Sequence, residues 1–278
     1  MRHRTSAEWV EYFEENERLW SRLEWPRDAG VSRDQIAAIL PSIQAWQLGE
    51  TSEGRHLRLA AARHAYATGD PAFADAVEYF IREEQRHGEA LGQFLDRIGA
   101  PRIRSNWGDS AFRAFRYARP SMELWTTVVI MVETMALVFY AALRRATPSP
   151  LMRQICGQIL RDEMPHLQFQ YERLGAAQAA RPAWRRALVG AGQRILFFAV
   201  VLAVWVDHRR LLKAGGHSFR SYWSQSWRRM RWIRQKMYAE EPSRRSTKTT
   251  APPIRRRAAD AGVSGAIETP SRTRGWLH

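Results

Sequence analysis

The sequence predicts an all-α protein built around four long helices. Apolar residues recur at three- and four-residue spacing along most of the chain, and no strand alternation with hairpin turns stands out. Four long segments each open near a proline, which is favoured in the first helical turn because its missing N–H costs nothing there. The chain has 278 residues, 45% of them hydrophobic, so a substantial core is expected.

The elements follow in order along the chain. Residues 1–40 are expected to form short N-terminal helices that pack on the bundle, with a clear amphipathic pattern at 7–23. The bundle itself spans 41–178, and its long helices are expected at 41–67, 71–98, 120–145 and 150–174. The links 68–70 and 147–149 are short, so each pair of helices should form an antiparallel hairpin. We expect the longer link, 99–119, to cross over the end of the bundle.

Residues 179–239 contain two further predicted helices, at 182–213 and 218–238. The first holds the apolar run ILFFAVVLAVWV at 195–206, which is too short to span a bilayer and is more typical of a buried or interfacial helix. The second is basic and aromatic. These helices are expected to pack on the outside of the bundle, and the alternative is a membrane-surface element. We see no folded nucleic-acid module, so nucleic-acid binding is not expected.

Charge is concentrated at the C-terminus. Residues 209–278 hold 17 of the 43 Lys and Arg and 4 of the 28 Asp and Glu, giving 17 − 4 = +13 of the total +15. Residues 240–278 lose apolar periodicity and are predicted to be a disordered basic tail. Such a tail can bind nucleic acid, anionic lipid or an acidic partner protein, or simply be solvated.

The single cysteine and the N-terminal sequence both indicate which cellular compartment the protein occupies. The single cysteine, Cys156, excludes a disulfide framework, a zinc ribbon or a rubredoxin-type site within one chain. It fits a reducing compartment. The first residues lack an apolar signal region. We therefore expect a cytoplasmic protein, with membrane association as the alternative.

Four glutamates occupy the same depth in the four long helices, each 12 or 13 residues after the opening proline: Glu53, Glu84, Glu133 and Glu163. Histidines follow two of them at i+3, as His87 and His166, and so share their helix face. One Glu from each of two helices, plus Glu-x-x-His from each of the other two, is the ligand set of di-iron and di-manganese carboxylate bundles.

Electrostatics supports a metal pair. Four carboxylates meeting in an apolar bundle would repel one another, and two divalent ions would cancel that charge. Carboxylate oxygens with one imidazole per ion suit iron, and manganese as the alternative. Glu50 shares roughly one face with Glu53, but distance to the hairpin turn favours Glu53. Whether Glu50 is the first ligand instead stays open.

The runs EEQRHGEAL and DEMPH, within 41–174, resemble the ferritin-like di-iron superfamily. This superfamily includes rubrerythrins, bacterial multicomponent monooxygenases, ribonucleotide reductase small subunits and acyl-carrier-protein desaturases. The resemblance implies a ferritin-like four-helix bundle with added N- and C-terminal helices. It also implies that Glu84 and Glu163 bridge two ions as the catalytic centre. Glu53 with His87, and Glu133 with His166, would be the terminal ligands.

Two further acids precede the bridging glutamates. Metal-bound histidines usually donate their second N–H to a carboxylate. By resemblance, Asp162 would serve His87 and Glu83 would serve His166. Pro165 lies inside the fourth helix, where it removes a helix hydrogen bond, and we expect it to bend that helix and open room beside His166.

The expected function is that of a non-haem di-iron oxidoreductase, which uses O₂ or peroxide and an external electron donor to oxidise a small-molecule or acyl substrate. The first alternative is iron oxidation and storage, or peroxide detoxification, of the ferritin and rubrerythrin type. The second is a membrane or partner adaptor with a structural metal. The oligomeric state stays open, and a homodimer is one alternative, since dimers are common among similar bundles.

Overall fold

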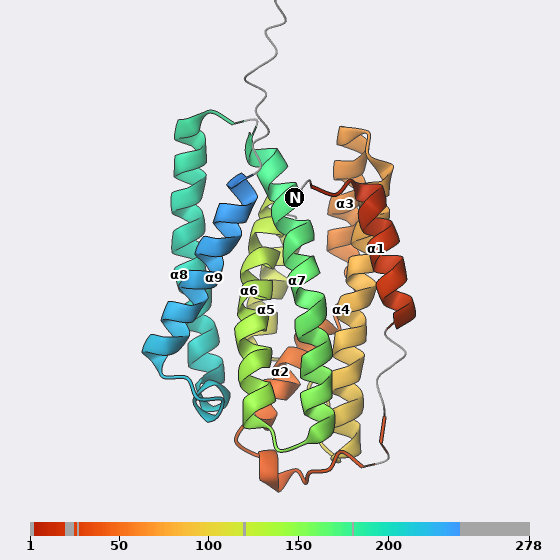
Figure 1. The fold of residues 1–278 in the computed structure, drawn as a ribbon, viewed down its shortest axis with the longest axis vertical. Coiled ribbons are helices and arrows are strands. Elements are labelled where there is room, and N and C mark those ends of the chain that lie inside the picture. Colours follow the sequence, from red (N-terminus) through yellow and green to blue (C-terminus); the bar gives the residue numbers. More distant parts are fainter. Residues whose placement is uncertain (1–2, 20–24, 27, 119–120, 180, 240–278) are drawn as a thin grey trace, which may run out of the picture. The chain divides into compact units, whose positions relative to one another are not determined.

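The computed structural model describes residues 3–19, 25–26, 28–118, 121–179 and 181–239, and in these ranges the chain is helical without any strand (Figure 1). The all-α prediction is therefore confirmed. The helices belong to one unit, Met1–Glu241. The predicted disordered tail, 240–278, lies outside the described residues.

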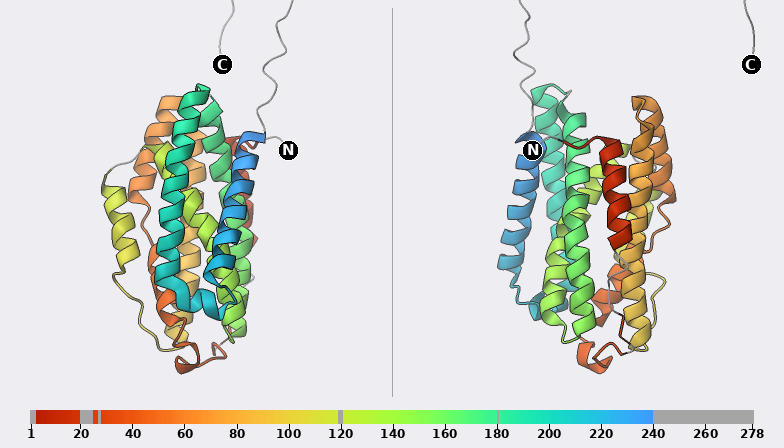
Figure 2. Two further views of the ribbon diagram at one scale, coloured as in Figure 1. Left: turned by 90° about the vertical axis from the view of Figure 1, so that its left-hand side faces the viewer. Right: turned by 45° about the vertical axis from the view of Figure 1, so that its right-hand side comes forward.

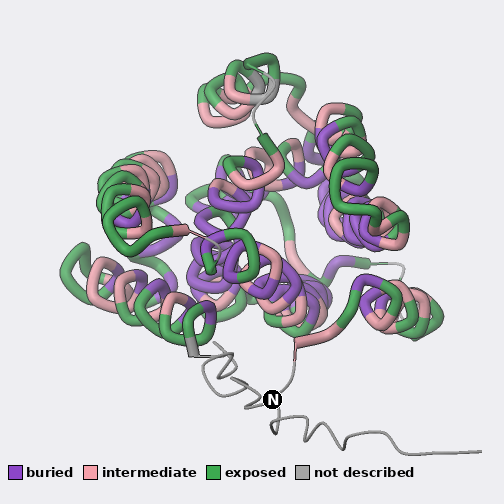
Figure 3. Tube along the Cα trace, turned by 90° about the horizontal axis from the view of Figure 1, so that it is seen from above, coloured by how far each residue is buried: buried purple, intermediate pink, exposed green. Residues whose placement is uncertain are grey.

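Four helices carry the centre of this unit: α2 (Leu40–Glu50), α4 (Pro71–Arg97), α6 (Met122–Ala146) and α7 (Pro150–Ala179). They lie side by side with their buried faces turned inward (Figures 1 and 3). α4 and α7 begin at the prolines that the sequence pointed to. α6 is capped by Ser121, whose side chain accepts a hydrogen bond from the Leu124 amide, and is buried along most of its length.

The first long helix is broken, contrary to the single helix predicted at 41–67. α2 ends at Glu50, and α3 (Arg55–Thr68) starts after Gly54, which has a left-handed φ of 67°. A side chain at Gly54 would collide with Ile81, because an added Cβ would lie 2.7 Å from it. Gly88 of α4 packs against the break, where an added Cβ would lie 2.7 Å from Thr51. Glycine thus fixes both the turn and its close approach to α4.

The link between α4 and α6 also differs from its prediction. It contains an unpredicted helix, α5 (Trp107–Tyr117), and runs along the side of the helices, not across one end (Figure 2). Consequently α4 and α6 point the same way. α5 is attached through Phe112 and Phe115, whose rings lie 5.8 and 5.4 Å from the Trp125 ring of α6.

α1 (Ser6–Leu19) packs on α4, and a short 3₁₀ helix (Asp34–Ile36) precedes α2. Trp9 and Phe13 of α1 are fully buried against Phe169 of α7. Trp9 also donates a 2.9 Å hydrogen bond to Glu172, so α1 is held by apolar and polar contacts.

α8 (Ala183–Ala214) and α9 (Phe219–Ala239) pack against α6, and α9 also contacts α7 (Figures 1 and 2). Among the described residues, α6 and α8 are long and apolar enough to cross a membrane by length and composition. In α6, 83% of the most apolar 18-residue window is buried within the protein, as in a core helix. In α8, only 17% of the corresponding window is buried.

Pro165 lies inside α7 without interrupting it. The helix continues in the α form from Pro150 to Ala179. The bend and the added room beside His166 stay predictions.

Candidate metal centre

Three helices deliver side chains to one buried cluster. Glu84 (α4), Glu133 (α6), and Glu163 and His166 (both α7) bring ligand atoms within 4.8 Å of one another. A second group consists of Glu50, His87 and Glu163 under the same limit. Glu163 belongs to both groups and therefore joins them into one centre with two halves.

Both histidines face the cluster with Nδ1. His166 Nδ1 lies 2.8 Å from Glu84 Oε1 and 3.8 Å from Glu163 Oε2. His87 Nδ1 lies 3.9 Å from Glu84 Oε1 and 3.9 Å from Glu163 Oε1. Atoms that bind one ion at ~2.1 Å in octahedral geometry are about 3 Å apart, so these separations suit shared ligands.

The outer nitrogens point to the acids expected from the sequence. His87 Nε2 lies 3.1 Å from Asp162 Oδ2, and His166 Nε2 lies 3.0 Å from Glu83 Oε2. Each acid comes from the helix opposite its histidine. An acid that accepts the Nε2 proton fixes the tautomer whose Nδ1 lone pair faces the cluster.

Several inward atoms lack hydrogen bonds. Glu84 Oε1, both oxygens of Glu163 and His166 Nδ1 are buried and make no hydrogen bond within the described residues. His166 Nδ1 and Glu84 Oε1 belong to this set although they lie 2.8 Å apart. Buried polar atoms without partners are costly, and bound cations would satisfy all of them at once. The donor set therefore fits a pair of divalent ions.

The buried carboxylates of the cluster favour positive charge beside them. Burial, reinforced by the charge of Glu163, raises the pKa of Glu133 well above its usual value. Burial likewise raises the pKa of Glu163. Burial alone would lower the pKa of His166, but the charge of Glu84 and other carboxylates raises it well above its usual value. Protons are thus drawn into the centre to offset carboxylate charge.

The pKa of Asp162 is shifted in the opposite direction, downward. Burial would raise its pKa, but the hydrogen bond and charge of His87, together with His166 and Asn16, lower that pKa to about 2. Asp162 is accordingly ionised at neutral pH and remains an acceptor for His87.

Glu50, and not Glu53, lies at the centre. Glu53 falls in the break between α2 and α3 and is exposed. Glu50 is the last residue of α2, is 9% exposed, and accepts a 2.8 Å hydrogen bond from the Tyr140 hydroxyl of α6. Burial, followed by the charge of Glu84, raises its pKa well above the usual value. The choice of Glu53 assumed one continuous helix, and the break invalidates the count of residues to the hairpin turn.

This correction gives a direct test. Glu50→Gln should weaken binding of one of two divalent ions by more than about tenfold, because the half of the centre with His87 loses its terminal carboxylate. Glu53→Gln should leave both affinities unchanged. Isothermal titration with Mn²⁺ under anaerobic conditions compares the two variants. If both variants lose metal affinity equally, Glu53 also reaches an ion. That result would show that the break between α2 and α3 closes when metal binds.

Residues outside the sequence motifs complete the site. Asn16 of α1 donates hydrogen bonds to Glu83 Oε1 and Asp162 Oδ1, and so links the two acids behind the histidines. No spacing rule connects Asn16 to them. Tyr140 lies seven residues after Glu133, two turns along one helix face, and that spacing could have drawn attention to it. Phe80 packs edge-on against His166 with ring centroids 4.8 Å apart.

A large cavity, of about 1070 Å³, reaches the centre from the side of α2, α3 and α5. Its walls include Glu50, Glu84 and Glu133. The neighbouring walls are largely apolar: Phe80, Ile81, Trp125, Val129 and Val132. The break between α2 and α3 and the helix α5 both line this cavity, so the two departures from the predicted fold shape the approach to the centre.

Comparisons with models of protein families, with curated proteins and with solved structures found no match to this chain.

Proposed function

We propose that the protein is a dinuclear-metal oxidoreductase of the ferritin-like type, which binds two iron ions and uses O₂ or peroxide to oxidise an organic substrate. The observation that carries this proposal is the cluster of inward-facing carboxylate and imidazole groups, in which the facing atoms of Glu84, Glu163 and His166 make no hydrogen bond within the described residues. The arrangement of α2, α4, α6 and α7, with a long connection between α4 and α6, is also the one expected for a ferritin-like bundle.

The residues divide into shared and terminal ligands. Glu84 and Glu163 lie between the two histidines and would bridge the ions. Glu50 with His87 would hold one ion, and Glu133 with His166 the other. Two iron ions, when bound there, would supply electrons for reduction of O₂ or peroxide.

The protein's own contribution is positioning and exclusion of water. Asp162 and Glu83 hold the imidazole rings with Nδ1 inward. The Tyr140 hydroxyl orients the Glu50 carboxylate and can pass a proton to it. α1 covers His166 from outside, with the Phe13 ring 6.0 Å from the imidazole. α1 therefore covers one side of the centre, and the cavity reaches the centre from another side.

The cavity favours an organic substrate over simple iron storage. Its apolar walls next to Glu84 and Glu133 offer a binding site for a hydrocarbon segment, with polar side chains such as His56 and Arg63 farther along the lining. We expect a small-molecule or acyl substrate whose oxidised carbon lies against Phe80 and Val129. Such a substrate and an external electron donor complete the proposed reaction.

The test is anaerobic Fe(II) titration followed by exposure to O₂. The expected result is two irons per chain by elemental analysis and Mössbauer spectroscopy, and O₂ uptake that continues only while a chemical reductant is supplied. Uptake in proportion to added iron, with many irons retained per chain, would instead indicate storage. Failure to bind iron or manganese would overturn every metal-dependent function.

A further inference from the structure

The outer face of α8 is apolar and largely exposed among the described residues. Six large apolar side chains lie on it, and each is at least 42% exposed: Trp184, Leu188, Ile195, Phe198, Leu202 and Val206. At roughly 100° per residue all six fall within an arc of about 80°, and at ~1.5 Å per residue they extend over about 33 Å. We call these six residues the α8 stripe. Isolated exposed apolar residues are ordinary, but a continuous stripe of this length marks an interaction surface.

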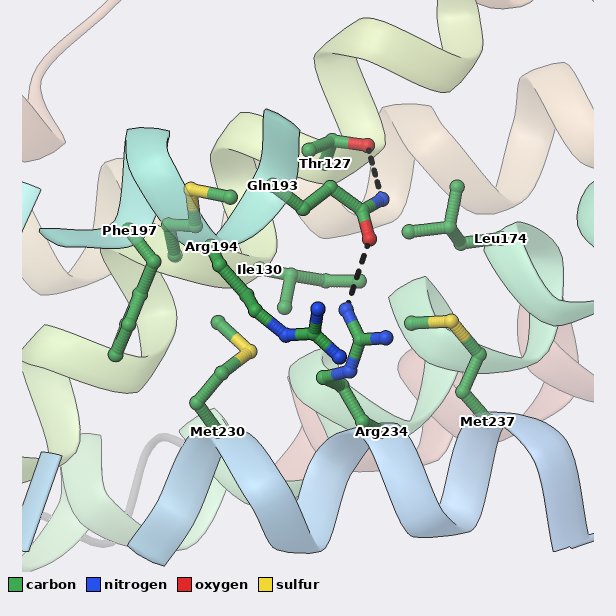
Figure 4. Close-up of a pocket in the computed structure, with 10 residues that line it drawn as sticks. Thr127, Ile130, Leu174, Gln193, Arg194, Phe197, Met230, Arg234 and Met237 are labelled. Atoms are coloured by element: carbon green, nitrogen blue, oxygen red, sulfur yellow. Dashed lines mark hydrogen bonds between the residues drawn. The ribbon is translucent and has the colours of Figure 1, made fainter. Parts of the chain in front are cut away.

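Packing within the protein does not require this stripe, because the inner side of α8 is separately filled. Phe197, Val201 and Leu211 are fully buried on that side. Figure 4 shows the same interface as a chain of contacts, in which Arg234 of α9 donates to Gln193 of α8 and Gln193 donates to Thr127 of α6. α8 is thus anchored inward and apolar outward, and its outward residues need a different explanation.

The surroundings of the stripe are basic. α8 contains six Arg and Lys and one acid, Asp207, and α9 contains six Arg and Lys and no acid. Arg194, Arg209 and Lys213 of α8 are exposed beside or beyond the stripe. On α9, which packs beside α8, Arg228, Arg231 and Lys236 are exposed. The outward parts of the tube in Figure 3 are largely exposed. The apolar surface is therefore bordered by positive charge.

Aromatic rings join the apolar and basic parts. Phe198 of the stripe packs edge-on against Trp223 of α9 with centroids 5.0 Å apart, and Trp205 packs against Phe219 at 5.3 Å. Trp184 stands at the start of the stripe, 60% exposed, with the Arg185 guanidinium 5.1 Å from its ring centroid. Tryptophan and arginine beside an apolar helix face suit the boundary between headgroups and acyl chains.

We infer that the α8 stripe, with the basic side of α9, docks on the surface of an anionic lipid bilayer. The stripe enters the acyl boundary while the arginines and lysines contact lipid phosphates and anionic headgroups. A second copy of the chain fits the α8 stripe less well than an anionic bilayer does. Symmetric pairing across this face would bring the six cations of α8, and those of α9, close to the same cations of the partner. The α8 stripe lies on the outside of the protein and includes no residue of the metal centre.

The test is sedimentation of the full chain with vesicles of phosphatidylcholine, with and without phosphatidylglycerol. We expect binding to the anionic vesicles. The double variant Leu188→Glu with Ile195→Glu should reduce the partition coefficient at least tenfold. The matched control is Leu59→Glu with Tyr66→Glu on α3, where both side chains are also exposed. All three proteins retain residues 242–278, so any lipid binding by that segment is common to them.

Two further measurements make the result decisive. Lipids with brominated acyl chains should quench the tryptophan fluorescence of the wild type but not that of the stripe variant. Quenching requires that tryptophan side chains enter the acyl region of the bilayer. Light scattering should show the same oligomeric state for wild type and stripe variant. Equal vesicle binding by stripe and control variants, or no binding by the wild type, would overturn the inference. A protein that dimerises through the stripe and does not bind vesicles would also overturn the inference.

Discussion

Replacing Glu163 by glutamine is expected to abolish tight binding of both metal ions. Glu163 is the residue shared by the two groups of ligand atoms, and both of its oxygens are buried without hydrogen bonds. Losing its charge removes one ligand from each ion, so both affinities should fall by more than about 100-fold, beyond the effect of changing an outer hydrogen-bond partner. Anaerobic titration with Fe(II) or Mn²⁺, followed by elemental analysis after gel filtration, measures this loss.

The matched control is Glu172→Gln. Glu172 is also a buried glutamate on α7, but it accepts hydrogen bonds from Trp9 and from the Arg4 amide instead of facing the cluster. This variant should lose some stability and keep both ions. If Glu163→Gln binds two ions with wild-type affinity, the bridging assignment is wrong even though the residues lie together.

The second large effect concerns stability and pH. Without metal, the free energy of unfolding should fall by about 2–4 kcal/mol as pH rises from 5.5 to 8. Glu50, Glu133 and Glu163 have pKa values raised above the ordinary value of 4.5, chiefly by burial. A raised carboxyl pKa contributes stability that is present below about pH 4.5 and lost as pH rises through the folded pKa.

The histidines act in the same direction. Burial opposes the charged form of His87 and His166, yet the surrounding carboxylates raise both pKa values above 6.5. Their contribution is complete below about pH 6.5 and is lost at higher pH. Asp162, with a pKa of about 2, contributes the opposite slope only in strong acid, outside this window.

Urea unfolding across this pH range, with and without metal, measures the effect. Metal should reverse the slope, because ligands bind ions in their deprotonated forms, and a hundredfold excess over the dissociation constant should add about 2.7 kcal/mol. The Glu163→Gln variant without metal should lose part of the pH dependence. A metal-free protein whose stability rises between pH 5.5 and 8 would mean that the cluster does not hold its protons in the folded state.

The sequence predicted most of the centre because helical spacing converts directly into a shared face. Glu84 and His87 lie within α4, and Glu163 and His166 within α7, so a count of three residues sufficed to place each pair. The pairing of Asp162 with His87 came from the resemblance to a known family, and the distances agree with it.

The errors arise where a helix ends. The segment 51–54 contains no proline that would indicate a helix break. A single glycine, Gly54, occurs in helix interiors as well as in turns, so it does not indicate a break by itself. The contact that decides it, the close approach of Gly54 to Ile81, joins residues from different helices. For the same reason Asn16 could not be predicted, since only the docking of α1 brings it to Glu83 and Asp162.

The position of Glu50 at the end of α2 has a consequence for the order of folding. Glu133, Glu163 and His166 all come from the hairpin of α6 and α7, whose short link closes a small loop. Glu50 and Glu163 are 163 − 50 = 113 residues apart, so bringing them into contact has a higher entropic cost of loop closure. We expect the hairpin to form first and capture one ion while the chain is still collapsing, and the second ion to enter only when α2 has docked. The metal would then act as a nucleus that directs α4 and α2 to their places.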